Sequence, residues 1–298
     1  MQPLIYIFVK GLLTVCAVLP LWVLHVVAGL WGAALYIFPT RSRATTLKNL
    51  KACFPEKGNN EIAALAKESL KNTACTALEI GKAWLLPVDK TIALIVDEES
   101  TGLKKFSAAT KAGQGVILLA PHLSNWEVLG FFIGEIHRTT YLYQPPKLQY
   151  LDELTRKARS RSGISMVPTN RKGVAQLLKA LQSGEVVAIL PDQVPPDESG
   201  IYAPFFGQQA LTMTLVSKLV QRTNAKVFSG FAERLPRGEG FKAVLQEANA
   251  AIYSDNLEES VAGLNKSVEE CVRLAISQYQ WEYKRFRRQP DGAKLYKN

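Results

Sequence analysis

The chain has 298 residues, of which 47% are hydrophobic and 21% are charged. A chain of this length and composition can bury a sizeable core, which excludes an intrinsically disordered or fibrous protein. Lys and Arg outnumber Asp and Glu by 36 to 26, and the formal net charge of +10 predicts an anionic partner. Nucleic acid and an anionic membrane or phosphorylated lipid are the two candidates that this charge leaves open.

The first forty residues favour a membrane over nucleic acid. From Gly11 to Thr40 no side chain carries a formal charge at neutral pH, and Leu, Val, Ala, Trp and Ile dominate. A helix rises about 1.5 Å per residue and needs roughly 20 residues to cross the hydrocarbon core. We therefore expect residues 1–40 to form a membrane anchor, as a single transmembrane helix or a tilted or re-entrant helix kinked at Pro20. A cleaved secretory signal fits less well, because its apolar region spans only about 7 to 15 residues.

The charges on either side of this run predict its orientation. Lys10 precedes it, whereas four cations follow it closely, at Arg41, Arg43, Lys48 and Lys51. Since positive charges favour the cytoplasmic flank, we expect residues 41–298 to lie on the cytoplasmic side of the membrane. These residues contain no low-complexity linker and no internal repeat, which favours one domain. The four cysteines lack the short paired spacing of zinc or redox motifs and are expected to be reduced and mostly buried, at Cys16, Cys53, Cys75 and Cys271.

Strand and helix patterns alternate after the anchor. Apolar residues at helical spacing predict one or two helices over residues 59–86. Two uninterrupted aliphatic runs, Gly115–Leu119 and Val186–Leu190, are typical of strands that are buried on both faces of a sheet. The patterns between them predict a helix after residue 124, a strand near 141–143, a basic helix over 151–162 and a helix over 173–182. This alternation predicts an α/β fold with a mostly parallel central sheet and flanking helices.

His122 follows the first aliphatic strand and is the best-placed candidate for a catalytic base. Open α/β sheets place their chemistry at the carboxyl ends of strands, and an imidazole can take a proton from a hydroxyl near neutral pH. Glu127, five residues later, could bind the second ring nitrogen, fix the tautomer and stabilise the imidazolium. The expected chemistry is activation of an alcohol for attack on an acyl carbon. A second interpretation stays open, because Ser124 and Glu127 also match a capping box at a helix start.

Several residues near these loops are candidates for substrate binding. On the predicted basic helix Arg156 and Arg159 would share a face that could clamp an acceptor phosphate. A solvated charge run is the alternative for each member of this cluster, Arg156, Lys157, Arg159 and Arg161. Arg171 is a weaker candidate of the same kind, Asp192 could instead be a turn residue, and backbone amides around Asn125 could stabilise an oxyanion. No metal or nucleotide cofactor is expected, because the sequence has neither a glycine-rich phosphate loop nor a cluster of metal ligands.

The C-terminal segment 279–288 interleaves aromatic and cationic residues. This composition suits a membrane interface, where indole and phenol rings lie at headgroup depth and arginines meet phosphates. The alternative is a terminal helix that packs its aromatic rings inward and leaves its charges in solvent.

Five segments in this order resemble one family, the bacterial lipid A late acyltransferases, which are the lauroyl and myristoyl transferases of lipopolysaccharide biosynthesis. The resemblance covers nearly the whole chain. It depends on the apolar leader followed by Asn49-Leu50-x-x-Cys53-Phe54-Pro55-Glu56, on His122-x-x-x-x-Glu127, on Leu190-Pro191-Asp192-Gln193, on Phe205-Phe206-Gly207-x-x-Ala210-x-Thr212, and on Tyr279-x-Trp281-x-Tyr283-x-Arg285-Phe286. A single His-x4-acid box is weak evidence, whereas these segments together are specific.

The resemblance implies transfer of a fatty acyl chain from an acyl carrier protein thioester to a hydroxyl of an acylated lipid A precursor. It also implies a lysophospholipid-acyltransferase-like α/β domain behind a single-pass anchor in the bacterial inner membrane. Under this resemblance His122 is the base and Glu127 its orienting acid, in preference to the capping role. Arg159 is similar to an arginine in a segment that lines the cleft, and the expected partner of this arginine is Asp192. Transfer is expected to be direct, without a covalent acyl-enzyme.

Two other functions remain as alternatives at this point. A related enzyme could acylate a glycerophospholipid or another glycolipid, although glycerolipid acyltransferases often carry aspartate at the position of Glu127. A protein of a different class could use the leader and the basic surface as a non-enzymatic, membrane-anchored recruitment module. None of these functions involves nucleic acid as a partner.

Overall fold

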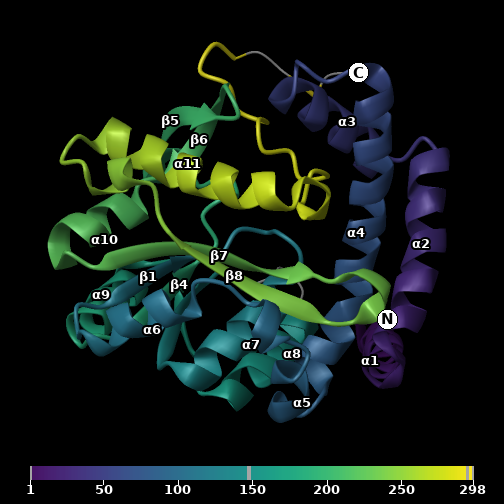
Figure 1. The fold of residues 1–298 in the computed structure, drawn as a ribbon, viewed down its shortest axis with the longest axis horizontal. Helices are drawn as coiled ribbons and strands as arrows, with labels where there is room; N and C mark the ends of the chain where they lie inside the picture. Colours follow the sequence, from purple (N-terminus) through teal and green to yellow (C-terminus); the bar gives the residue numbers. More distant parts are fainter. Residues whose placement is uncertain (1, 146–148, 293–294, 297–298) are drawn as a thin grey trace.

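The predicted α/β fold is confirmed by the computed structural model, which describes residues 2–145, 149–292 and 295–296 of the chain. A six-stranded sheet with the order β3-β2-β4-β1-β7-β8 forms its centre (Figure 1). All neighbouring pairs are parallel except β7 and β8. The strands are β1 (Val116–Leu119), β2 (Thr139–Tyr143), β3 (Ser165–Pro168), β4 (Val186–Ile189), β7 (Lys226–Arg234) and β8 (Phe241–Glu247).

The central strands are buried on both faces, as their aliphatic sequences predict. In β1, Ile117 and Leu119 belong to one apolar core and Val116 and Leu118 to another, because successive side chains alternate across a sheet. Helices α9 (Arg171–Gln182), α10 (Leu215–Thr223) and α11 (Leu257–Leu274) contribute to the first core. Helices α6 (Leu103–Lys111), α7 (Trp126–Ile136) and α8 (Gln149–Arg159) contribute to the second.

The register of the two aliphatic strands decides where the loops that follow them emerge. Strands β1 and β4 are parallel neighbours, with Leu119 paired to Ile189 at their last positions. The segment that carries His122 and the segment that carries Asp192 therefore leave the same edge of the sheet side by side. Parallel α/β sheets form their sites at this carboxyl edge.

A small hairpin lies above the sheet beside α11 (Figure 1). It consists of β5 (Gly200–Phe205) and β6 (Gln208–Met213), which pair antiparallel. Its two turn residues both have positive φ, 47° at Phe206 and 74° at Gly207, which is the geometry of a two-residue hairpin turn. Phe206 tolerates this conformation because its backbone N–H donates to the buried Glu269 carboxylate at 2.6 Å.

The N-terminal run of apolar residues is not one helix. It forms α1 (Gln2–Val18) and α2 (Leu21–Ile37), which are separated at Pro20 because proline lacks the N–H that a continuous helix needs. The expectation of one long helix is therefore corrected. Within the described residues, no individual helix has both the length and the apolar character of a membrane span, and one sharply bent pair, Leu21–Ile37 with Arg41–Cys53, passes by length and composition only.

Helices α1 and α2 both pack against α4 (Asn59–Leu85), which runs along one end of the molecule (Figure 1). Glycines allow close approach at these contacts, since a Cβ on Gly32 would lie 2.4 Å from the Lys71 Cα. The outer faces of both helices are apolar and exposed, and carry Ile5, Ile7, Phe8, Leu12, Val15, Val18, Trp22, Val26, Val27, Leu30, Trp31 and Ile37. Exposed apolar surface of this extent marks an interaction site.

The remaining elements are short. Helix α3 (Arg41–Cys53) leads into α4, and α5 (Val88–Ile92) follows it. The predicted basic helix ends earlier than expected, because α8 stops at Arg159 and a 3-10 turn covers Ser160–Ser162. The other 3-10 turns are Asp97–Glu99, Asp197–Ser199, Pro236–Gly238, Ala250–Tyr253 and Ile276–Gln278. All four cysteines are buried and free, as predicted.

The C-terminal segment 279–288 is irregular and not a helix, but its aromatic rings at Tyr279, Trp281 and Phe286 pack inward, as the second interpretation of its composition predicts. Trp281 and Phe286 are 1% exposed. The segment needs hydrogen-bond partners for its backbone, and Asn49 supplies them by donating to the carbonyl oxygens of Trp281 at 2.7 Å and Tyr283 at 2.8 Å. The buried Arg285 binds the hairpin, with bonds to the Leu211 carbonyl and the Thr212 hydroxyl. The tail thus ties α3 to the hairpin.

Candidate active site

His122 lies just beyond the end of β1 and is held by Asp192, which lies just beyond the end of β4. One Asp192 oxygen accepts the backbone N–H of His122 at 2.9 Å, and the other lies 2.9 Å from the ring Nδ1. The His122 carbonyl accepts the Gln280 N–H of the C-terminal segment at 3.0 Å. Backbone and ring of His122 are therefore held by groups from two distant parts of the chain, the loop after β4 and the C-terminal segment.

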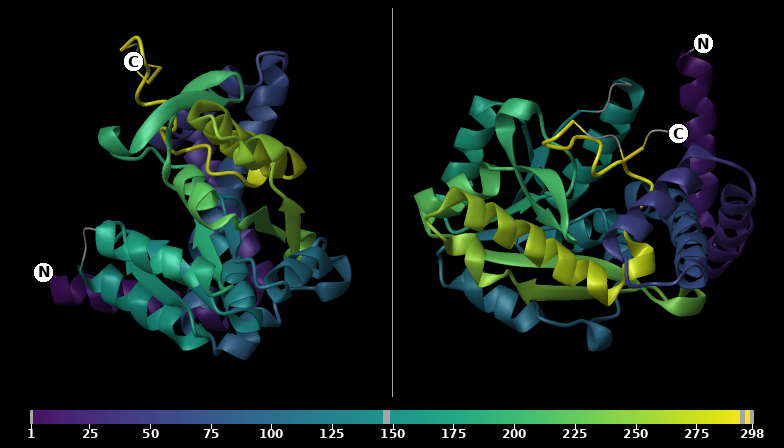
Figure 2. Two further views of the ribbon diagram at one scale, coloured as in Figure 1. Left: turned by 90° about the vertical axis from the view of Figure 1, so that its left-hand side faces the viewer. Right: turned by 90° about the horizontal axis from the view of Figure 1, so that it is seen from above.

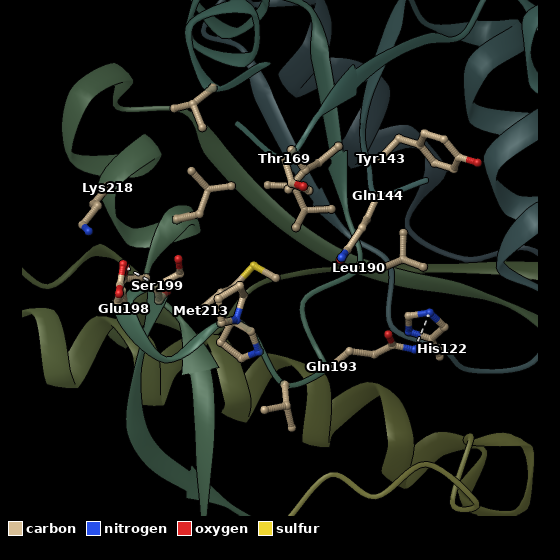
Figure 3. A pocket seen from close by; sticks show the side chains of 18 of the residues that line it. His122, Tyr143, Gln144, Thr169, Leu190, Gln193, Glu198, Ser199, Met213 and Lys218 are labelled. Atoms are coloured by element: carbon tan, nitrogen blue, oxygen red, sulfur yellow. Dashed lines mark hydrogen bonds between the residues drawn. The ribbon is translucent and has the colours of Figure 1, made fainter. Parts of the chain in front are cut away.

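This contact decides which imidazole nitrogen can act as a base. Asp192 is 3% exposed, and burial by itself would raise its pKa, but the His122 ring and its hydrogen bonds outweigh burial and lower that pKa. An ionised carboxylate only accepts, so Nδ1 must donate and Nε2 carries the free lone pair. The side-chain amide nitrogen of Gln193 lies 3.1 Å from Nε2 and donates to it (Figure 3).

The orienting contact that the sequence predicts for Glu127 is made by Asp192 instead. Glu127 accepts from Arg159 Nε at 3.2 Å and from Nη2 at 2.5 Å, so both of its oxygens are engaged by α8. Burial favours the neutral acid, yet the Arg159 guanidinium lowers the pKa of Glu127. The predicted pair of Arg159 with Asp192 is wrong for the same reason, because each residue has a different partner.

The capping interpretation of Glu127 is also wrong. Helix α7 starts at Trp126 and is capped by Asn125, whose Oδ1 accepts the Val128 N–H at 3.1 Å. The Ser124 N–H, which a capping box would pair with Glu127, donates instead to the Gln278 carbonyl at 2.8 Å. Ser124 has a φ of 55°, and a positive φ in a residue other than glycine is a strained backbone of the kind that occurs at functional sites.

A pocket of about 600 Å³ extends from His122 along the carboxyl edge of the sheet. His122 and Gln193 lie at one end, and Glu198, Ser199 and Lys218 lie at the other (Figure 3). The wall between these ends is mostly apolar and includes Leu142, Val174, Ile189, Leu190, Val194, Pro195, Met213 and Leu215. A base at the end of a long apolar pocket suits a reaction at the head of a fatty chain.

Only one member of the predicted basic cluster lines this pocket. Arg159 contributes to the wall beside Tyr143, and its guanidinium carbon lies 5.4 Å from the centre of that ring. Arg156 is exposed and paired to Asp152 on its own helix at 2.9 Å. Arg161 donates to the carbonyl oxygens of Trp84 and Leu86 at the C-terminal end of α4, so its role is structural.

The other two predicted substrate ligands, Asn125 and Arg171, do not line the main pocket. Asn125 is 1% exposed, and its side chain is used by the α7 cap and by Glu79, whose Oε2 accepts from Nδ2 at 3.1 Å. The side chain of Asn125 is therefore structural. Arg171 is exposed at the start of α9 and lines a second cavity beside the main pocket.

Comparison with known proteins identifies the chain. The family model of the bacterial lipid A biosynthesis acyltransferases matches residues 2–288. The chain belongs to this family. It is 29% identical to the lipid A biosynthesis lauroyltransferase of Escherichia coli over 89% of this chain and 85% of that protein. It is 26% identical to the palmitoleoyltransferase of the same organism over 96% and 92%, and 27% identical to a lipid A biosynthesis acyltransferase of Haemophilus influenzae over 84% and 79%.

The chain is accordingly an O-acyltransferase, and its family acts on lipid A. All five motifs that carry the resemblance meet around the pocket or its supports, since Arg285 of the C-terminal motif also bonds to Thr212 of the hairpin motif. The His122 box and the Asp192 loop bond to each other. The C-terminal motif supports His122 through Gln280 and contacts Phe54 of the leader motif, with ring centroids of Phe54 and Trp281 5.7 Å apart.

This acyltransferase also contains a buried polar network that the sequence does not predict. Glu79 of α4 is fully buried and receives two bonds from Arg234 of β7, at 2.5 and 2.7 Å. His25 of α2 lies 2.7 Å from the same carboxylate, and Asn125 at the start of α7 donates to it. Burial opposes ionisation, but Arg234 outweighs it and lowers the pKa of Glu79 to about 2. The network connects the N-terminal helices to the loop that carries His122.

The same network contains a set of potential metal ligands. His25, Cys75 and Glu79 place one ligand atom each within 4.8 Å of one another. Burial raises the pKa of the Cys75 thiol to about 11, which disfavours the thiolate that a metal would need. Both Glu79 oxygens are already engaged by Arg234. The residues therefore fit a buried ion pair better than a metal site.

Proposed function

We propose that this acyltransferase moves a fatty acyl chain from an acyl carrier protein thioester to a hydroxyl of an acylated lipid A precursor, with His122 as general base. The observation that carries the proposal is the Nε2 lone pair of His122, positioned by Asp192 at the end of an apolar pocket of about 600 Å³. The family match supports a lipid A acceptor, and the apolar wall supports a fatty acyl group.

The reaction needs one proton transfer in each direction. The acceptor hydroxyl displaces Gln193 from Nε2, gives its proton to His122 and forms a C–O bond to the thioester carbonyl carbon. The tetrahedral intermediate then breaks its C–S bond, and the leaving thiolate takes the proton from the imidazolium. Asp192 stabilises that imidazolium through Nδ1. The displaced Gln193 amide lies beside the reacting centre and can donate to the oxyanion.

In this proposal Glu127 contacts Arg159 and not His122, so it acts on the reaction only through Arg159. Its bidentate contact fixes Arg159 in the pocket wall, and this ion pair ties α7 to α8 next to the base. We place Arg159 near the acceptor and Glu127 behind it as a positioning residue. Since Arg159 is already paired with a carboxylate, its role is to orient a polar group of the acceptor more than to neutralise a free phosphate.

The exposed apolar faces of α1 and α2 form the membrane contact in this proposal. A carrier-borne thioester and a lipid acceptor must meet at a bilayer surface, and these helices present apolar side chains to it. The cations that follow α2, at Arg41, Arg43, Lys48 and Lys51, favour the cytoplasmic face of the bacterial inner membrane.

A donor and acceptor assay tests the function. Purified enzyme is incubated with acyl carrier protein thioesters and either a tetra-acylated lipid A precursor or lysophosphatidate, and the products are identified by mass spectrometry. We expect acylation of the lipid A precursor, and a loss of several orders of magnitude in kcat for His122→Ala. Acylation of lysophosphatidate alone would favour the glycerolipid alternative. Unchanged cellular function of His122→Ala would favour the non-enzymatic one.

A further inference from the structure

A second cavity of about 500 Å³ adjoins the end of the acyl pocket opposite His122. Thr169 and Val174 line both cavities, so the two are continuous along the start of α9. Arg171 lies in the wall of the second cavity at the start of α9, and Arg222 approaches it from the end of α10. The acyl pocket therefore borders a basic surface at this end.

Four exposed cations make up this surface, which we call the α9–α10 basic patch: Arg171, Lys172, Lys218 and Arg222. Lys218 and Arg222 are four residues apart on α10 and share a face. Within the part of the chain that the structure describes, no salt bridge involves any of the four, whereas cations such as Arg138 and Arg156 are paired. Glu198 is the acidic residue in the pocket wall near Lys218 (Figure 3). The patch thus keeps a surplus of positive charge for a partner.

The position of the patch favours a soluble protein over a lipid surface as its partner. Helices α9 and α10 lie at one end of the long axis of the molecule, and α1 and α2 lie at the other (Figure 1). The view from above shows the same separation (Figure 2). The patch and the apolar faces of α1 and α2 therefore lie at opposite ends of the molecule, and electrostatic attraction is largely screened beyond about 8 Å at physiological salt.

We propose that the α9–α10 basic patch docks an acidic carrier protein, whose thioester arm enters the acyl pocket past Lys218. This inference rests on the proposed function and adds the surface that receives the donor. An acidic protein complements the four unpaired cations. Docked on the patch, it would remain outside the acyl pocket while its thioester arm enters the mouth of the pocket. Such a surface acts mainly on the association rate and weakens with salt.

Two acyl donors, one with a carrier protein and one without, distinguish an effect on carrier docking from an effect on the acyl-transfer reaction. The variant Lys172→Glu/Arg222→Glu changes two cations that do not line the acyl pocket, and it is assayed with acyl carrier protein thioester and with acyl-pantetheine, which has no protein. We expect about a tenfold or larger fall in kcat/KM for the carrier thioester, a weaker salt dependence, and no change for acyl-pantetheine. The control Lys67→Glu/Lys90→Glu makes the same change in charge on α4 and α5 and should keep the carrier kcat/KM.

The outcomes against the proposal are equally specific. An unchanged kcat/KM for the carrier thioester, or equal losses with both donors, overturns docking at this patch. Reduced binding to phosphatidylglycerol vesicles with normal carrier kinetics would assign the patch to lipid instead. If the wild-type enzyme uses neither donor on a lipid A precursor, the proposed function fails, whatever the variants do.

Discussion

Asp192 binds His122 twice, with one oxygen on the backbone N–H and the other on the ring Nδ1, each at 2.9 Å. The same carboxylate thus positions the loop and selects the tautomer of the base. Burial, and then the Asp192 carboxylate, also raise the pKa of the Tyr279 hydroxyl well above its usual value. The acid that binds the His122 ring therefore comes from the loop after β4, and not from the helix that follows His122.

Replacement of Asp192 by Asn tests this pairing. The amide can still fill the space, but it cannot hold Nδ1–H and stabilise the imidazolium as a carboxylate does. We expect kcat to fall by about 10³ to 10⁴ with a small change in KM, as in other enzymes that lose the acid behind a histidine base. Thermal unfolding should show that Asp192→Asn remains folded. Near-normal kcat would mean that another group orients His122.

Replacement of Glu127 by Gln gives a matched contrast. If Glu127 acts only through Arg159, Glu127→Gln should lower kcat by roughly 10- to 100-fold, clearly less than Asp192→Asn. The double variant Glu127→Gln/Arg159→Met should then be no worse than the worse single variant, because the two residues act as a pair. Equal losses for Glu127→Gln and Asp192→Asn, with additive effects of Arg159→Met, would restore Glu127 as the orienting acid.

The sequence was sufficient to predict the sheet and the edge of the sheet at which His122 lies. The aliphatic runs of β1 and β4 are typical of strands that are buried on both faces of a sheet, and the polar loops after them predict a site at their carboxyl ends. His122, Asp192 and Arg159 were all identified as site residues, and the pocket includes His122 and Arg159. The predicted contact between His122 and Glu127 was wrong because the partner of His122 depends on which strands are neighbours. Neither strand's sequence indicates that β1 and β4 lie side by side.

Other features were missed because their causes are not local in sequence. Glu79 and Arg234 are 155 residues apart, so no spacing rule connects them. The C-terminal segment has the composition of an interfacial helix, yet Asn49, more than 200 positions earlier, satisfies its carbonyl groups and lets it remain irregular in the interior. In contrast, the break at Pro20 had a local signal, since Pro20 was already recognised as a kink position.

The Glu79 network predicts a defined pH dependence of stability. The pKa of Glu79 is about 2 in the folded protein and about 4.5 in the unfolded chain, so the ionised form is favoured by folding. This contribution, roughly 3 kcal/mol as an upper estimate, is complete above pH 4.5 and is lost as the pH falls toward 2. Glu79→Gln should be less stable at pH 7, where it leaves Arg234 buried without its partner, and should show a flatter loss of stability below pH 5. Chemical unfolding at pH 7 and at pH 3.5 measures both effects, and parallel losses in wild type and variant would contradict this role.

The exposed apolar faces of α1 and α2 predict that these helices bind the enzyme to the membrane. Phe8 is 72% exposed and Leu30 is 73% exposed, and an aspartate at either position would have to enter the bilayer with its charge. Phe8→Asp/Leu30→Asp should lose co-sedimentation with vesicles of phosphatidylethanolamine and phosphatidylglycerol, yet keep its kcat on an acceptor dispersed in detergent. The control Ile136→Asp/Leu274→Asp alters two exposed apolar residues on α7 and α11 and should still bind vesicles. Equal binding by both double variants would place the membrane contact elsewhere, whereas loss of activity in detergent would show that α1 and α2 also support the fold through α4.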